Sequence, residues 1–355
     1  MATNTLPLVG ANYIRRERLL AMTAEAFAGS SATSFNIYID VNSMIKCLFQ
    51  PVFEISMCNN ENELAAVLIN MIAHYRYIFW SSLRVRTRFF FIYSNNIPTA
   101  AKLLYPDWNK NFEEQLRNDY KGKSSFLLKN LTKVKQMIPY ITDCAFMTGT
   151  YDTTVIMHNV MALEDDGNPN IIITKDLFTM QLAGINKNTV IYRPKKSEGN
   201  DVSYVVSPYN NGLYKHYIAS KNAQQPVFDV EIAPSLYSFY LALVGGERQV
   251  KSITSCTAAA KELLELVKKP NVLNSHNIDI SLLVNSLGPK LQGKALRENV
   301  FGRFKIIDTV TQSIAYINTA ESKMYEGIRN LNDPVGFHTI LEDFSNDCPI
   351  KVEQL

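Results

Sequence analysis

Short apolar runs alternate with helical stretches through much of the chain, and this alternation constrains the fold more than any other feature. The runs and the helical stretches follow one another at 35–40, 61–83, 89–93, 112–138, 153–163, 171–173 and 189–193. The run FFFIY at 89–93 has no polar alternation, which is typical of a strand buried on both faces. The sequence therefore predicts an α/β fold with a mostly parallel central sheet flanked by helices.

The pattern changes after residue 234 to helices alone. Helical patterns lie near 235–244, 257–269, 279–286, 306–331 and 336–345. The chain has 355 residues, 46% of them hydrophobic, so it is long enough to bury a large core. Three parts are predicted, which are an N-terminal appendage at 1–34, an α/β domain at 35–234 and a helical region at 235–355.

Charge, cysteine content and hydropathy narrow the class of protein. The 36 basic and 33 acidic residues give a formal net charge of +3, which does not by itself require a polyanionic partner. The five cysteines have no Cys-x-x-Cys spacing, so reduced thiols are favoured over a zinc site. No apolar run reaches the roughly twenty residues that a bilayer-spanning helix needs. We therefore expect a soluble, intracellular protein without a membrane span.

Two of the strand-like runs are followed by an aspartate. Asp40 ends the run 35–40, and Asp176 follows the run 171–173. In open α/β sheets, ligands bind outside the carboxyl ends of the strands. Two carboxylates there suit a magnesium ion, which prefers oxygen ligands. Capping of the helices that follow each aspartate is the alternative interpretation, and local spacing alone favours it.

Several stretches, taken in order, resemble the flap-endonuclease and phage 5′-nuclease family of the PIN-like superfamily. They are 37–43, 93–111, 171–182, 236–246 and 258–264. The stretch IYIDVNS at 37–43 resembles the opening strand with its metal aspartate, and 171–182 resembles the strand that carries two further metal aspartates, followed by glutamine and leucine. The last two stretches resemble the helices of the helix–three-turn–helix element. The resemblance covers about 35–270 and implies a PIN-like 5′-nuclease fold.

The chain departs from this pattern at most of the positions where the family has metal carboxylates. Ser94 stands at the end of the second strand, threonines occupy most of 148–154, and Phe178 replaces the second aspartate of the fourth motif. The carboxylates that remain as vestigial catalytic candidates are Asp40, Asp152, Asp176 and Glu247, of which Asp40 and Asp176 are the candidates for a weakly bound Mg²⁺.

These departures lead to a prediction about function. Two-metal hydrolysis of a phosphodiester needs ions about 3.5–4 Å apart, and two aspartates cannot neutralise two dications. The connection at 253–257 also lacks the glycines with which the family approaches a phosphate. We predict a pseudonuclease, not an enzyme and without a cofactor, that serves as a structural or interaction subunit with other protein subunits. A viral or phage assembly is the predicted setting, in the virion or the host cytoplasm.

Two other functions remain open, a weak metal-dependent 5′-nuclease and a non-catalytic nucleic-acid-binding module. The candidate residues for nucleic-acid contacts are Arg84, Arg86, Arg88, Lys121, Lys123 and Lys129. The lysines lie where the family's arch threads a single strand, although a solvated helix face explains them as well. The arginines precede a strand and suit phosphate or a partner's carboxylates, or form a simple surface stripe.

Overall fold

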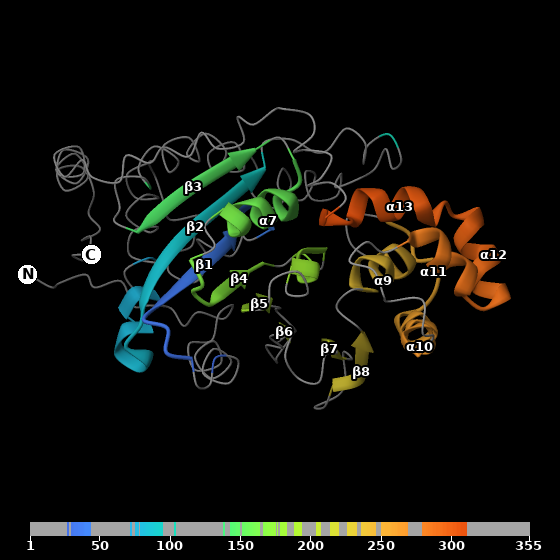
Figure 1. Cartoon of the computed structure of the whole chain (residues 1–355), viewed down its shortest axis with the longest axis horizontal. Coiled ribbons are helices and arrows are strands. Elements are labelled where there is room, and N and C mark those ends of the chain that lie inside the picture. The colour runs from blue at the N-terminus through green and yellow to red at the C-terminus, as the bar shows by residue number, and fades with distance from the viewer. Residues whose placement is uncertain are drawn as a thin grey trace, which may run out of the picture.

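The computed structural model shows a central sheet with a helix at 153–163 over one of its faces and a separate group of helices beside it (Figure 1). The residues that the structure describes are 27, 30–43, 72, 75–77, 79–94, 103, 138, 143–149, 151–163, 166–174, 176, 178–182, 188–193, 204–206, 214–219, 226–232, 236–245, 250–268 and 279–310. Most of the predicted appendage, the helical pattern at 112–138 and everything after 310 lie outside them, and so do Lys121, Lys123, Lys129 and Glu247.

The central sheet contains six strands in the order β3-β2-β1-β4-β5-β6. The strands are β1 (Ser34–Asp40), β2 (Arg86–Ser94), β3 (Cys144–Gly149), β4 (Asn170–Ile173), β5 (Thr189–Arg193) and β6 (Tyr204–Val206). The first five strands are parallel, and β6 runs antiparallel to β5 at the edge. The prediction of a mostly parallel sheet flanked by helices is confirmed.

The strand order reverses at β1, because the chain first builds β2 and β3 on one side and then returns to place β4 on the other. Such a reversal opens a crevice at the carboxyl ends of the two strands that flank it, and open α/β sheets bind their ligands there. The two strands here are β1 and β4, which pair from Asn36↔Asn170 to Ile39↔Ile173. Asp40 and Thr174 directly follow this pairing.

The side chains of β1 alternate between the two faces of the sheet, and both faces are covered. Tyr38 stacks on Phe90 of β2, with ring centroids 4.8 Å apart, on the face that helix α7 (Thr153–Leu163) covers with Ile156 and Met157. The neighbouring Phe35 packs on the opposite face against Phe79, whose ring centroid lies 6.2 Å away. Because both faces are covered, every residue of β1 after Ser34 is buried.

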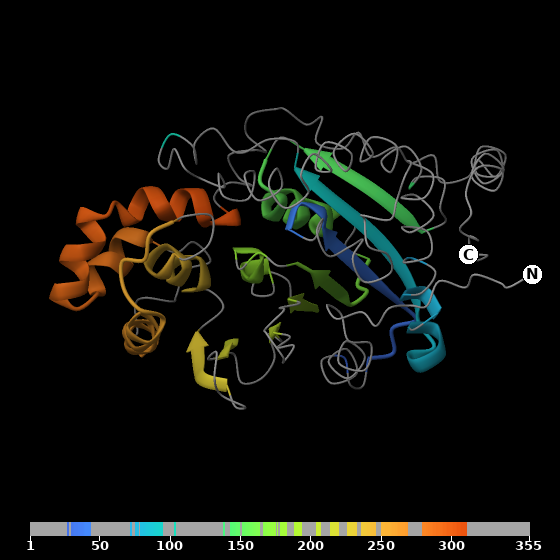
Figure 2. The same ribbon diagram turned by 180° about the vertical axis from the view of Figure 1, so that it is seen from behind.

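The second half of the described chain forms a compact helical group, seen from behind in Figure 2. Its helices are α9 (Tyr237–Val244), α10 (Cys256–Val267), α11 (Ile280–Ser286), α12 (Pro289–Arg297) and α13 (Val300–Ile307), and the antiparallel pair β7 (Tyr214–Ala219) and β8 (Pro226–Ile232) precedes them. Helices α9 and α10 lie at the positions predicted for the helix–three-turn–helix element. Residues 246–249 between them lie outside the described part, so that element stays a prediction.

Polar side chains fix the starts of these helices. Ser255 accepts a hydrogen bond from the Ala258 N–H and caps α10, and Asp279 accepts from the Ser281 N–H and caps α11. Gly245 ends α9 with φ +59°, and a Cβ there would lie 2.4 Å from the Val250 carbonyl oxygen, so glycine is required. Among the helices described, none combines the length and the apolar character needed to cross a membrane.

The amide of Gln181 joins the sheet to the helical group. Its Nε2 donates to the carbonyl oxygens of Phe178 (2.8 Å) and Ile307 (2.9 Å). Its Oε1 accepts from Ser238 Oγ (3.0 Å) and from the Thr309 N–H (2.8 Å). These four bonds satisfy a buried amide fully and connect the 3-10 helix η3 (Phe178–Gln181) with α9 and with the end of α13.

Candidate metal site

Asp40 lies at the carboxyl end of β1 and is 1% exposed. Its Oδ1 accepts a hydrogen bond from the Ser43 N–H (3.1 Å), and its Oδ2 accepts from Thr174 Oγ1 (2.8 Å). The first bond caps the short helical turn at 41–43, so the capping interpretation holds for this aspartate. The second bond ties the carboxylate to the segment that follows β4.

Asp176 lies beyond the end of β4, two residues after Thr174, and is 8% exposed. Its Oδ1 accepts from the Phe178 N–H (3.0 Å), which caps η3, and its own N–H donates to Thr174 Oγ1 (3.0 Å). The Thr174 hydroxyl therefore contacts both aspartates, through the side chain of Asp40 and the backbone of Asp176. The sheet brings the two predicted residues to one edge.

Thr174 Oγ1 also lies 3.1 Å from Ser43 Oγ. Because the Thr174 proton is given to Asp40, Ser43 is the donor in this contact. The Thr174 oxygen thus donates once and accepts twice, which fixes its orientation. We call Asp40, Ser43, Thr174 and Asp176 the strand-end cluster. It contains oxygen donors alone, and such donors suit a hard divalent cation.

Hydroxyl and amide groups occupy the neighbouring positions where the resemblance implies carboxylates. The side-chain amide of Asn42 brackets the backbone of Ser94, accepting from its N–H (2.7 Å) and donating to its carbonyl (3.1 Å). Ser94 Oγ donates to the Tyr151 carbonyl (2.5 Å), and Thr153 Oγ1 donates to Asn42 Oδ1 (3.2 Å). These neutral contacts hold the ends of β1 and β2 and the start of α7 together.

The other predicted site residues are placed as follows. The Oδ1 of Asp152 accepts from the Thr154 N–H (3.0 Å) at the start of α7. Phe178 is 2% exposed and belongs to the hydrophobic core. In the part of the chain that the structure describes, no three His, Cys, Asp or Glu side chains are grouped to hold a metal ion, so Asp152 does not join Asp40 and Asp176.

The predicted arginines lie at the other end of the sheet. Arg84 and Arg86 are exposed near the start of β2, whereas Arg88 forms an ion pair with Asp166 at 2.8 Å and lies over the ring of Phe90. Burial raises the pKa of Asp166, but hydrogen bonds from Asn168 and Asn36 and the charge of Arg88 together lower it below its ordinary value. Arg88 is therefore engaged within the fold.

Sequence reasoning missed Thr174, Ser43 and Asn42, although all three lie within three residues of a predicted aspartate. A hydroxyl or amide that directly follows a buried strand is the signal that could have found them. The bond between Thr174 and Asp40 joins residues 134 positions apart, so local spacing could not show it.

Comparisons with known proteins support the fold. The chain matches no protein-family model and no curated protein. Among solved structures it is similar to the T5 D15 protein crystallised with metal ions, with a TM-score of 0.53 and 10% identity. It is also similar to bacteriophage T5 D15 flap endonuclease in a complex with DNA and metal ions (TM-score 0.51, 10% identity) and to T5 5′-exonuclease with bound zinc (0.52, 11%). Each match covers 88% of this chain and 98% of the other.

This similarity shows the fold, which the chain shares with the phage T5 flap endonuclease and 5′-exonuclease. The resemblance inferred from the sequence is thereby confirmed. The prediction that the chain is not an enzyme is wrong, because the solved structures that share its fold are a flap endonuclease and a 5′-exonuclease. The missing carboxylates argue against a pair of metal ions, and they do not show that the chain is inactive.

Proposed function

We propose that the chain is a metal-dependent nuclease that cleaves nucleic acid with one divalent cation held by Asp40 and Asp176. The observation that carries the proposal is the strand-end cluster. It places two aspartates at neighbouring parallel strand ends, beside the reversal of strand order, and the Thr174 hydroxyl contacts the carboxylate of Asp40 and the backbone N–H of Asp176. The fold shared with phage nucleases supports the same assignment.

The residues of the cluster fit one magnesium or manganese ion. Mg²⁺ is commonly held by one or two carboxylates, and water and substrate phosphate complete its coordination. Two ionised aspartates balance the charge of one dication. A second ion beside Asp176 is disfavoured, because Phe178 fills the core where the resemblance implies another carboxylate. A single ion therefore suits this chain better than a pair.

The protein's own groups hold and orient the reacting parts. A bound divalent cation would polarise a phosphoryl oxygen and lower the pKa of a coordinated water. Thr174 and Ser43 fix the direction of the Asp40 carboxylate, and the Phe178 N–H fixes that of Asp176.

Helix α12 supplies a surface that suits the phosphates of the substrate. Lys290, Lys294 and Arg297 are exposed and follow one another at helical spacing along one side. The helix contains no acidic residue. Lysine and arginine side chains in this arrangement neutralise backbone phosphates irrespective of base sequence.

Cleavage of a labelled 5′-flap DNA in excess Mg²⁺ or Mn²⁺ tests the proposal. We expect the wild type to cleave and an Asp40→Asn/Asp176→Asn double variant to lose at least 100-fold in rate, since removing metal ligands removes the cation (about 2.7 kcal/mol). Asp279→Asn is the matched control, because asparagine caps α11 about as well as aspartate. Equal rates for wild type and double variant, or no cleavage by the wild type, would contradict the proposal.

Binding to other protein subunits and a viral or phage setting stay predictions. Most of the predicted appendage at 1–34 and the chain after 310 lie outside the described residues. The proposed domain boundaries at 34 and 234 stay predictions as well.

A further inference from the structure

Two exposed aromatic side chains lie at the amino end of the sheet. Tyr77 is 64% exposed and Trp80 is 51% exposed, on a helical segment that ends at residue 83. Trp80 lies three positions and Arg84 seven positions after Tyr77, so the three side chains share one side of the segment. The Arg84 guanidinium carbon lies 6.0 Å from the centroid of the Trp80 ring. Arg86, the exposed first residue of β2, follows directly.

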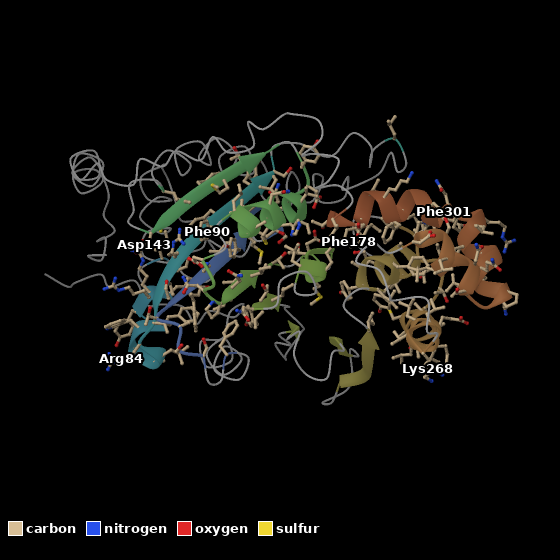
Figure 3. The ribbon with its side chains drawn as sticks, viewed as in Figure 1. Arg84, Phe90, Asp143, Phe178, Lys268 and Phe301 are labelled. Carbon is tan, nitrogen blue, oxygen red and sulfur yellow. The ribbon has the colours of Figure 1, made fainter. Side chains whose placement is uncertain are left out.

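We call Tyr77, Trp80, Arg84 and Arg86 the amino-end surface. Figure 3 shows Arg84 at one end of the molecule and Phe178 near its middle, between the sheet and the helical group. The amino-end surface is therefore separate from the strand-end cluster, which lies at the carboxyl ends of the same parallel strands. A ligand of the amino-end surface would therefore not contact the residues that are proposed to hold the metal ion.

The backbone at Arg84 indicates that the side chain matters. Arg84 has φ +59°, and its N–H donates to the Trp80 carbonyl (3.1 Å), as at the end of a helix. Glycine is the usual residue in this left-handed conformation, because a Cβ is strained there. Arginine at this position places a guanidinium beside the Trp80 ring at a cost in backbone conformation.

The charge of the surface is positive. Arg88, the next arginine on the same side of β2, forms an ion pair with Asp166. For Arg84 and Arg86, no carboxylate partner is found within the described residues. A guanidinium that no carboxylate of the described residues engages suits phosphate, which it binds through two parallel hydrogen bonds.

We propose that the amino-end surface binds single-stranded nucleic acid, with bases stacked on Trp80 and Tyr77 and phosphates held by Arg84 and Arg86. Aromatic side chains combined with cations are the means by which proteins hold single strands without reading their sequence. The three-residue spacing of Tyr77 and Trp80 corresponds to a rise of about 4.5 Å along the helix. That exceeds the roughly 3.4 Å rise between bases stacked in a duplex, so an extended strand fits better. Aromatic residues and arginine also mark protein interfaces, and the experiment therefore includes an acidic peptide.

Tryptophan fluorescence tests the stacking directly. The chain contains two tryptophans, so a Trp108→Phe variant leaves Trp80 as the single emitter. We expect a thymidine oligonucleotide of about twelve residues to quench this emission, with an affinity that falls steeply as salt rises. Unchanged Trp80 emission on oligonucleotide binding would overturn the proposal. Equal quenching by a poly-glutamate peptide would overturn it too, since it would point to an acidic protein partner.

Substitutions separate binding from folding. In the anisotropy of a labelled oligonucleotide, we expect Trp80→Ala, Arg84→Gly and Arg86→Gln each to weaken binding at least fivefold. A Lys305→Gln variant, which removes an exposed charge on α13, should change it less than twofold. Circular dichroism confirms that each variant folds. Unchanged affinity in all three variants would contradict the assignment.

The test is independent of the proposed cleavage activity. An Asp40→Asn/Asp176→Asn variant should keep the Trp80 quenching in full, because its substitutions lie at the other end of the strands. Lost cleavage with retained quenching supports both proposals, and retained cleavage without quenching overturns the amino-end surface alone.

Discussion

At the residue scale, Thr174 carries the geometry of the strand-end cluster. Its hydroxyl oxygen accepts hydrogen bonds from the Asp176 N–H and the Ser43 hydroxyl, and its hydroxyl proton is donated to the Asp40 carboxylate. A buried hydroxyl with three partners is costly to remove, because each partner loses one of its hydrogen bonds. Of the two aspartates, Asp40 depends on it directly, because the Thr174 hydroxyl holds one of its carboxylate oxygens.

We expect Thr174→Val, which removes the hydroxyl at constant shape, to lower the free energy of unfolding by about 1–3 kcal/mol in urea titrations. It should also weaken Mn²⁺ binding about tenfold or more, since groups that orient metal ligands have effects of that size. Thr189→Val is the matched control. Thr189 is equally buried, and its hydroxyl has no hydrogen-bond partner among the described residues. A loss of stability as large for Thr189→Val would contradict this role of Thr174.

Arg84 allows a second test at the same scale. Replacing it with glycine should raise the free energy of unfolding by about 0.5 kcal/mol, because relief of the left-handed backbone outweighs the lost contact with Trp80. Arg86→Gly within β2 should have the opposite sign, because glycine weakens a strand. Thermal denaturation of both variants measures the difference. Destabilisation by Arg84→Gly would show that the side chain serves the fold.

At the element scale, α7 contains a titratable group with a depressed pKa. Burial lowers the pKa of His158 below its ordinary value, and the nearby Asp308 raises it by less. The unfolded chain therefore binds a proton more readily, and stability is lost as pH falls below about 6.5. We expect urea midpoints to fall from pH 7.5 to pH 5.5 and to fall less in a His158→Gln variant. An equal fall in both would remove His158 as the cause.

The contact between η3, α9 and α13 depends on one amide. Gln181→Leu should lower the free energy of unfolding by about 2–3 kcal/mol, because it leaves a buried N–H, a hydroxyl and two carbonyls without their partner. Gln292→Leu on α12, whose amide makes a single exposed bond to Asn285, is the control and should change stability by less than about 0.5 kcal/mol. Similar losses in both would show that the buried amide does not join the two halves.

The strands made of continuous apolar residues could be predicted from the sequence, whereas the largely polar helix α12 could not. Runs at 35–40, 89–93, 171–173 and 189–193 correspond to β1, β2, β4 and β5, because buried parallel strands need continuous apolar residues. Helix α12 was missed, since it buries little besides Leu291 and Ala295. Helix α13 was missed as well, and it ends at Ile307 with Asp308 as its cap. Of the helix predicted at 306–331, residues 309–310 are helical and the rest lies outside the described residues.

The site was predictable in part for the same reason. Asp40 and Asp176 stand out because each follows an apolar run, and the parallel pairing of β1 with β4 brings them to one edge. The hydrogen bonds of Thr174 and Asn42 reach across strands that are distant in the sequence. Such contacts depend on strand order, which periodicity does not reveal.

At the scale of the whole molecule, the strand order and the packing of the helical group together determine the surroundings of the strand-end cluster. The reversal at β1 sets the crevice, and Gln181 anchors the helical group beside it. The basic side of α12 belongs to that group, whereas Arg84 lies at the far end of the sheet (Figure 3). The proposed nuclease thus has a metal site at the strand ends, a cationic side on α12 of the helical group, and a separate aromatic surface.

The stoichiometry of Mn²⁺ binding, measured by electron paramagnetic resonance on the full chain, tests the single-ion account most directly. We expect one Mn²⁺ per chain in the wild type, lost in the Asp40→Asn/Asp176→Asn variant and retained in Asp279→Asn, since one dication balances two carboxylates. Two bound ions, or one ion that survives the double substitution, would contradict the account.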